Sequence, residues 1–136
     1  MDLDEARQVL REQHRAVLAT RRADGAPQLS PVVVGVDDAG AATVSTRETA
    51  LKVRNLRREG RAWLCVLPDG FFGRWVQVEG DVEIVELPAA LEGLRALYRQ
   101  VSGEHPDWGE FDDAMARERR VLLRVHLERA GPDVSG

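Results

Sequence analysis

The chain has 136 residues, of which 31% are charged and 43% are hydrophobic, and its formal net charge is -4. This length and composition predict one ordinary globular domain with its own core, and the acidic balance argues against nucleic-acid proteins of the generally basic kind. No apolar run approaches the roughly 18 residues that a membrane span needs, and the first residues lack the pattern of a targeting signal. The single cysteine, Cys65, has no partner for an intramolecular disulfide. We therefore expect a cytoplasmic protein that binds neither membrane nor nucleic acid.

The first third of the chain predicts one helix followed by three strands. Asp2 is a cap residue with Glu5 three positions later, and apolar residues recur at helical spacing, so a helix should run to about His14. Three strands should then form a meander, at residues 16–21, 28–36 and 41–46. Pro31 cannot donate to a β-ladder, so its strand should be an edge, a bulge or a place where a ligand replaces a neighbouring strand.

The rest of the chain predicts further helices and strands. A short basic helix over residues 52–58 should bury Val53 and Leu56. We expect strands at residues 61–67, 75–80, 82–86 and 121–128, and helices that begin near Pro88 and Asp107. This element order predicts a mainly β fold, a six- to seven-stranded antiparallel β-barrel with peripheral helices. The barrel should occupy residues 1–129, and residues 130–136 should form a flexible C-terminal tail.

Positive charge is concentrated in residues 45–62, which hold six basic and two acidic residues. Hydroxyl groups precede the first helical turn at Ser45, Thr46 and Thr49, where free backbone N–H groups and the helix dipole favour an anion. Lys52 adds a mobile positive charge at the same place. The segment predicts a site for a phosphorylated, multiply anionic small molecule. The alternative interpretation is a solvated basic face without a ligand.

The chain shows no catalytic set of its own. The three histidines, His14, His105 and His126, are scattered, so no metal-ligand spacing is present. Neither a Gly-x-Ser-x-Gly nucleophile motif nor a Gly-rich phosphate loop occurs. We therefore expect no catalytic side chain and no metal site. A bound cofactor should carry the reaction while the protein orients it.

Several segments, taken in order, resemble the pyridoxamine-phosphate-oxidase-like split-barrel family, and within it the actinobacterial coenzyme F420-dependent reductases. The segments that carry the resemblance are Val17-Leu18-Ala19-Thr20, residues 24–31 (Asp-Gly-Ala-Pro-Gln-Leu-Ser-Pro), Val44-Ser45-Thr46, residues 52–58 (Lys-Val-Arg-Asn-Leu-Arg-Arg), Leu97-Tyr98-Arg99 and residues 103–108. The resemblance runs from about residue 9 to residue 129. It implies a homodimer of six-stranded split β-barrels that binds a flavin or deazaflavin in a groove between the subunits.

The resemblance also implies which residues hold the cofactor. The phosphate would be held by Lys52, with Ser45, Thr46 and Asn55. The ring edge would be lined, largely through backbone groups, by Gln28, Ser30, Pro31 and Val32, with Trp75 and Gln77 approaching from a neighbouring strand. The alternatives are a polar strand face for Gln28 and Ser30, and core packing or a dimer contact for Trp75.

The cofactor is expected to be coenzyme F420, with FMN as the alternative. F420 carries a phosphodiester and a polyglutamate tail, which suit a groove with several arginines better than the single phosphate of FMN does. The candidates for the tail are Arg54, Arg57 and Arg58. Ala50 stands where related sequences often carry an arginine, which weakens the tail assignment or shifts it to Arg47.

The function predicted on this basis is a coenzyme F420-dependent oxidoreductase. Reduced deazaflavin would give a hydride to a conjugated, electron-poor small molecule such as a quinone, an unsaturated lactone or a biliverdin-like tetrapyrrole. The alternatives are an FMN-dependent oxidase or reductase of the same family and a non-catalytic flavin- or haem-binding protein. The Arg124-Val125-His126 triplet resembles the arginine-x-histidine of true pyridoxamine phosphate oxidases but lacks their following Asp-Arg, so we expect no vitamin-phosphate specificity.

Overall fold

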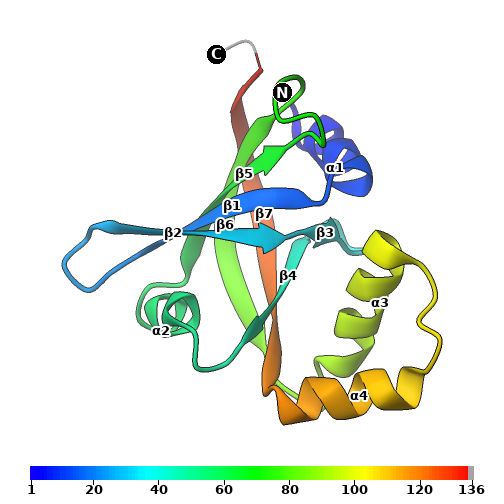
Figure 1. The fold of residues 1–136 in the computed structure, drawn as a ribbon. Helices are drawn as coiled ribbons and strands as arrows, with labels where there is room; N and C mark the ends of the chain where they lie inside the picture. The colour runs from blue at the N-terminus through cyan, green and yellow to red at the C-terminus, as the bar shows by residue number, and fades with distance from the viewer. Residues whose placement is uncertain (135–136) are drawn as a thin grey trace.

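The computed structural model describes residues 1–134, which form four helices and seven strands (Figure 1). In chain order these are α1 (Leu3–Glu12), β1 (Arg15–Arg21), β2 (Pro27–Val33), β3 (Gly35–Val36), β4 (Ala42–Arg47), α2 (Leu51–Arg58), β5 (Arg61–Leu67), β6 (Val76–Val85), α3 (Leu91–Ser102), α4 (Trp108–Arg117) and β7 (Arg120–Asp133). Helix α1 begins as predicted, because the Asp2 side chain accepts a hydrogen bond from the Glu5 N–H at 2.8 Å. Among these residues, no helix combines the length and the apolar character needed to cross a bilayer.

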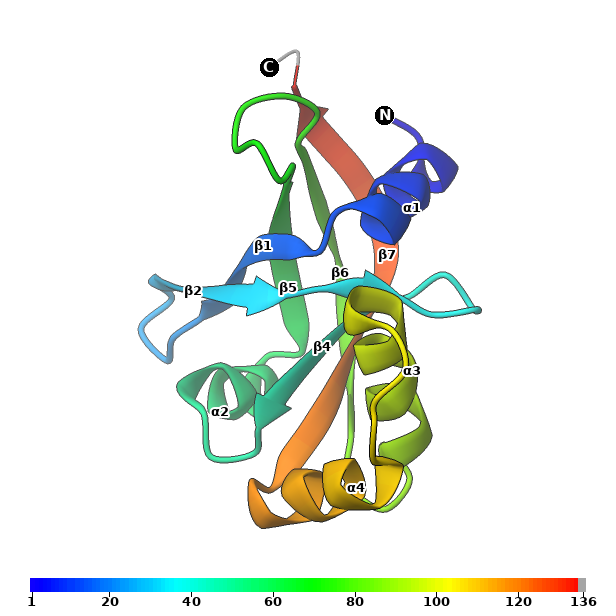
Figure 2. The same cartoon turned by 45° about the vertical axis from the view of Figure 1, so that its right-hand side comes forward.

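All seven strands belong to one antiparallel sheet with the order β2-β1-β5-β6-β7-β4-β3. The sheet curls so that β2 and β4, which are far apart in this order, approach each other (Figures 1 and 2). Its inner face is filled by alternate apolar residues, so Leu18, Val44, Leu64, Val78 and Leu123 are almost completely buried. The predicted fold class, a mainly β split barrel with six to seven antiparallel strands, is confirmed.

The helices pack outside the sheet, and α3 and α4 lie together against β4 and β7 (Figure 2). Alternation along β7 explains this arrangement: Leu123 points into the barrel, whereas Leu122 packs against Leu94 of α3 and Phe111 of α4. Helix α2 lies on the other side of the end of β4 from the α3–α4 pair, and it buries Val53 as predicted. The helical pair and α2 therefore flank the end of β4.

The predicted meander of the first three strands is wrong. Strands β1 and β2 form the expected hairpin, with Leu18 opposite Ser30. The strand predicted over residues 28–36 breaks at Val34, whose N–H donates to the carbonyl oxygen of His14 at 3.0 Å. The chain continues as β3 and β4 at the other end of the sheet, where β4 pairs with β7. An alternating pattern marks which face of β4 is buried, but it does not specify the neighbouring strand.

Three element boundaries also differ from the prediction. Residues 75–80 and 82–86 contribute to one strand, β6, which passes through Gly80 so close to β7 that a Cβ there would lie 1.8 Å from the His126 carbonyl oxygen. Helix α3 begins at Leu91, not at Pro88. Strand β7 continues to Asp133 by pairing with β6, so residues 130–133 are strand where a tail was predicted. Residues 135–136 of that tail lie outside the described residues.

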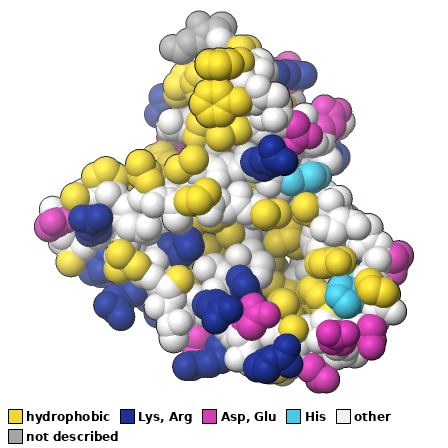
Figure 3. Space-filling view, in the orientation of Figure 1, with side chains coloured by type: hydrophobic (Ala, Val, Ile, Leu, Met, Phe, Trp, Pro, Cys, Tyr) yellow, Lys and Arg dark blue, Asp and Glu magenta, His cyan; other side chains and the backbone are white. Residues whose placement is uncertain are grey.

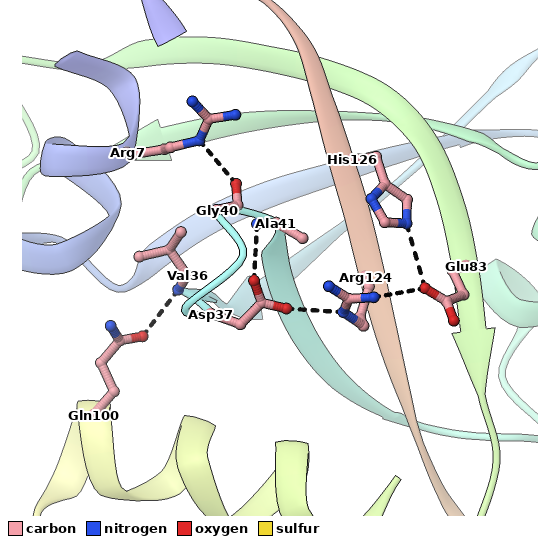
Figure 4. A network of polar contacts seen from close by, with 9 residues as sticks. All are labelled: Arg7, Val36, Asp37, Gly40, Ala41, Glu83, Gln100, Arg124 and His126. Carbon is pink, nitrogen blue, oxygen red and sulfur yellow. Dashed lines mark hydrogen bonds and ion pairs between the residues drawn. The ribbon is translucent and has the colours of Figure 1, made fainter. Parts of the chain in front are cut away.

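A polar network holds the β3–β4 turn between α3 and β7 (Figure 4). Asp37 of this turn accepts a hydrogen bond from Arg124 Nε at 2.8 Å, and Arg124 also donates to Glu83 at 2.7 Å. On the other side, the Gln100 side-chain oxygen accepts the Val36 N–H at 2.9 Å. The arginine of the Arg-Val-His triplet therefore connects strands, and the network fixes the distance between α3 and the sheet.

Candidate functional site

The first turn of α2 carries a positive charge that no carboxylate in residues 1–134 neutralises. Helix α2 begins at Leu51, and its N-cap residue, Ala50, provides no side-chain hydrogen bond to the free N–H groups. Lys52 is half-buried and makes no ion pair or hydrogen bond with the described residues. Burial, and to a lesser extent the charge of Arg120, lower the pKa of Lys52 below its usual value of 10.5. The turn is therefore suited to an anion from outside the chain.

Lys52 belongs to a group of charged side chains whose sum is positive. The ion pairs around it are Arg120–Glu118 at 2.8 Å, Arg47–Glu118 at 3.4 Å and Arg119–Glu48. With Lys52, four cations face two carboxylates, so this group, which we call the anion corner, has a net charge of +2. Figure 3 shows Lys and Arg side chains gathered below the centre of the molecule, over the region where α2 and the ends of β4 and β7 meet in Figure 1. Arg120 could not be identified from the sequence, because only the β4–β7 pairing brings it here.

The two hydroxyl residues predicted at the end of β4 point in opposite directions, because successive strand residues alternate between faces. Ser45 faces the helical pair and lines a groove together with Arg120. Thr46 is buried on the inner face of the sheet. Of these two predicted phosphate ligands, only Ser45 shares a surface with the anion corner.

Asn55 is placed as a structural residue. Its side chain is buried, with only 1% of the residue exposed. The Nδ2 group donates to Thr20 Oγ1 at 3.1 Å, and Oδ1 accepts from Arg58 at 3.2 Å. The amide nitrogen therefore joins α2 to β1, and the amide oxygen contacts the last turn of α2. The family resemblance had implied a phosphate contact for Asn55. The hydroxyl of Thr20, which no sequence pattern marked as a site group, is the centre of this link.

Strand β2 turns three of the predicted ring-edge residues inward. Gln28, Ser30 and Val32 lie on the face that pairs with the buried side of β1. Pro31 points outward on an edge strand, which is one of the three positions that the sequence left open. The Gln28 side-chain oxygen accepts from Thr20 Oγ1 at 3.3 Å. Ser30 Oγ is buried and has no hydrogen-bond partner among the described residues. A buried hydroxyl without a partner costs free energy, so it indicates a place where a ligand completes the bonding.

The three arginines predicted for the cofactor tail have different surroundings. Arg57 is paired with Glu86 at 2.8 Å. Arg58 donates to Asn55 and to the backbone oxygen of Arg21. Arg54 is exposed and makes no hydrogen bond or ion pair with residues 1–134. Arg54 is therefore the arginine of this helix that is available to a ligand without breaking an existing contact.

Trp75 and Gln77 do not lie next to the other predicted residues within one chain. Gln77 pairs with Cys65, Cys65 with Val17, and Val17 with Pro31. Three strand spacings, about 14 Å, therefore separate Gln77 from β2. Trp75 directly precedes β6, two residues before Gln77.

A groove of about 320 Å³ extends from the anion corner between the sheet and the α3–α4 pair. Ser45, Ser102 and Arg120 are its polar lining residues, and Val33 of β2 adds an apolar one. The apolar walls from the two helices are Leu94, Leu97, Tyr98, Val101, Phe111 and Met115. The sequence gave no signal that these helix residues line an open groove.

A sequence profile described as pyridoxamine 5'-phosphate oxidase matches residues 3–131. The chain belongs to the pyridoxamine 5'-phosphate oxidase family. This confirms the resemblance inferred from the sequence segments.

Solved structures of similar fold support the family assignment. The conserved hypothetical protein Rv2991 from Mycobacterium tuberculosis superposes with a TM-score of 0.79 at 27% identity, over 96% of this chain and 82% of that one. An F420 reductase matches with a TM-score of 0.72 at 22% identity, over 91% and 94% of the two chains. The haem storage protein HutZ from Vibrio cholerae matches with a TM-score of 0.72 at 20% identity, over 98% and 96%. At these last two identities the likeness is one of fold.

Members of the pyridoxamine 5'-phosphate oxidase family bind flavins such as FMN. Two observations indicate that the residues present here suit a flavin or a deazaflavin, one for its phosphate and one for its ring. The half-buried Lys52 has no anion partner in the described chain, and the buried hydroxyl of Ser30 has no hydrogen-bond partner. One offers a charge for a phosphate and the other offers a hydrogen bond for a polar ring edge.

Proposed function

We propose that this chain is a coenzyme F420-dependent oxidoreductase that reduces a conjugated, electron-poor small molecule. The observation that carries the proposal is Lys52, an uncompensated cation in the uncapped first turn of α2. The anion corner around it has a net charge of +2, which attracts a phosphorylated ligand more strongly than a neutral one.

Charge favours F420 over FMN. A phosphodiester with a polyglutamate tail needs a row of cations beyond the phosphate, and Arg54 is exposed and unpaired among the described residues two positions after Lys52. FMN ends in one phosphate and leaves Arg54 without a role. An F420 reductase of the same fold is consistent with this choice.

When bound, reduced F420 supplies a hydride from its C5 atom. The residues of this chain bind and orient: Lys52 holds the phosphate, the Ser30 hydroxyl bonds to the ring edge, and Gln28 is fixed by Thr20 beside it. Asn55 keeps α2 and β1 at a fixed separation. No side chain acts as a nucleophile, so the rate gain comes from proximity and from hydrogen bonds to developing charge.

A second copy of the chain is the proposed partner, on the outer face of β2 and β1. This face exposes apolar side chains, with Leu29 62% and Val33 52% exposed. Figure 3 shows hydrophobic atoms spread over the side that carries the β1–β2 hairpin. Gln77 is in register with Pro31 on the same face, so Gln77 and Trp75 would serve the groove of the partner subunit. Sedimentation should give a dimer for the natural chain and a monomer for Leu29→Asp; a natural chain that sediments as a monomer contradicts the dimer.

Haem binding is the alternative function, because a haem storage protein shares the fold. Haem in a protein groove is held by an axial side chain, most often histidine. Here His14 bonds to the Val34 oxygen at 2.9 Å, His105 packs between aromatic rings, and His126 contacts Glu83 at 3.3 Å. None of the three lines the groove at the anion corner, which favours the deazaflavin reading.

The proposal is tested by titrating the purified protein with F420, with FMN and with haem at one moderate salt concentration. We expect micromolar or tighter binding of F420, and binding of FMN at least tenfold weaker. Tighter binding of FMN would assign the chain to the flavin-dependent enzymes of the family. Haem binding alone would make it a carrier and would contradict the proposal.

A further inference from the structure

The groove between the sheet and the α3–α4 pair has a charged, polar end at Arg120, and its other lining is apolar apart from Ser102. Ser45 and Arg120 stand at the polar end, beside Lys52. Leu94 and Met115 belong to the apolar end, one from each helix. A groove of this kind selects a molecule that is itself divided into an apolar body and a charged group.

The apolar end is held in place by an aromatic cluster. The Tyr98 and Phe111 rings meet edge to face with centroids 5.4 Å apart, and Trp108 packs against Phe111 at 5.3 Å. An ion pair between Arg95 of α3 and Asp112 of α4 braces the helices, with Nε to Oδ1 at 2.9 Å. The walls are therefore formed before a ligand arrives, which lowers the entropic cost of binding.

Charge at the polar end exceeds what the cofactor requires. The anion corner has a net charge of +2, and the phosphodiester of F420 carries one negative charge. One positive charge then remains on the trio in which Arg120 and Arg47 share the Glu118 carboxylate, and Arg120 of this trio lines the groove. A carboxylate on the second ligand neutralises it, whereas a neutral ligand leaves it uncompensated at an apolar wall.

We propose that this groove is the acceptor site and that it takes a compact, planar, ring-bearing carboxylate, with the ring between the helices and the carboxylate at Arg120. The volume of about 320 Å³ lies at the lower limit of ligand pockets, about 300 to 1,000 Å³, and therefore selects one or two fused rings over a tetrapyrrole. The role as an acceptor site rests on the proposed function. A quinone that bears a carboxylate would gain here a hydride from reduced F420 and a proton from solvent, two electrons in all, and would leave as the corresponding hydroquinone.

The test uses two probes of equal shape, 2-naphthoate and its neutral amide 2-naphthamide, each titrated calorimetrically without cofactor. We expect the natural chain to bind naphthoate at least tenfold more tightly than the amide. Arg120→Gln should bring the two affinities within about twofold, and Met115→Trp, which fills the apolar end, should weaken both at least tenfold. Arg129→Gln, an exposed change farther along β7, the strand of Arg120, is the matched control and should leave both affinities unchanged.

Equal binding of the two probes by the natural chain, or unchanged binding by Met115→Trp, would overturn the assignment of the groove. A parallel F420 titration separates this result from the proposed function. If F420 binds and the probes do not follow the pattern, the groove assignment fails alone. If the probes follow the pattern and F420 does not bind, the groove is a carboxylate site and the deazaflavin function fails.

Discussion

The partnerless hydroxyl of Ser30 leads to a prediction in which stability and binding change in opposite directions. Ser30 lies on the inner face of β2, opposite Leu18, and its Oγ is buried without a hydrogen-bond partner among residues 1–134. If this hydroxyl forms a hydrogen bond with a ligand, it lacks a hydrogen bond in the ligand-free protein and gains one in the complex. Ser30→Ala removes the hydroxyl and keeps the Cβ atom, so it isolates this effect.

The magnitudes follow from the cost of a buried unsatisfied group, about 1–3 kcal/mol, against the net value of a hydrogen bond, about 0.5–1.5 kcal/mol. Ser30→Ala should therefore raise the free energy of unfolding of the cofactor-free protein by about 1 kcal/mol. For a chain of this size that corresponds to a melting temperature higher by about 3 °C. The same change should weaken cofactor binding by about three- to tenfold, because the complex loses a hydrogen bond.

Thermal unfolding followed by circular dichroism gives the first quantity, and a fluorescence titration with F420 gives the second. Asp113→Ala, an exposed change in α4 outside the groove, is the control and should change the stability by less than about 0.5 kcal/mol. A Ser30→Ala variant that is less stable and binds F420 with unchanged affinity would refute the reasoning, because the hydroxyl would then be structural.

The other predictions concern the link around Asn55 and the titration of Lys52. Asn55→Ala leaves the buried Thr20 hydroxyl without its donor and should lower the free energy of unfolding by about 1–3 kcal/mol in urea titrations; a loss below 0.5 kcal/mol would contradict the structural role given to this amide. Because the folded state lowers the pKa of Lys52, the unfolded chain binds the additional proton in the window just below pH 10.5, so this residue makes the stability rise with pH across that window. Lys52→Met should remove that part of the slope in unfolding experiments at a series of pH values, and an identical slope in both proteins would show that Lys52 is not desolvated.

Local patterns in the sequence predicted most of the elements. A continuous apolar run located β5, and the alternation of apolar residues located the inner face of β7. The spacing of Val53 and Leu56 located the buried side of α2. Pro31 correctly marked an edge strand, because its missing N–H excludes it from the interior of a ladder. These features depend on residues close together in the chain, which is why periodicity and turn residues identify them.

Features that depend on long-range pairing were not predictable from such patterns. After Val34 the chain leaves β2 and crosses to the other end of the sheet, where β4 pairs with β7. This pairing brings Arg120 beside Lys52. The burial of Asn55 could not be anticipated, because an asparagine beside a basic run is typical both of a ligand contact and of a structural link. The groove under α3 and α4 depends on how two helices sit on one sheet, and no single segment encodes it.

The most direct test of the central claim is an F420 titration of the natural chain, Lys52→Ala and Arg57→Ala under identical conditions. Lys52 has no anion partner among the described residues, whereas Arg57, on the same helix, is paired with Glu86, so the second variant controls for the loss of one positive charge. We predict that Lys52→Ala weakens F420 binding at least tenfold, about 1.4 kcal/mol, and that Arg57→Ala changes it less than threefold. Equal affinities for the natural chain and a correctly folded Lys52→Ala variant would contradict the assignment of this helix turn as the cofactor phosphate site.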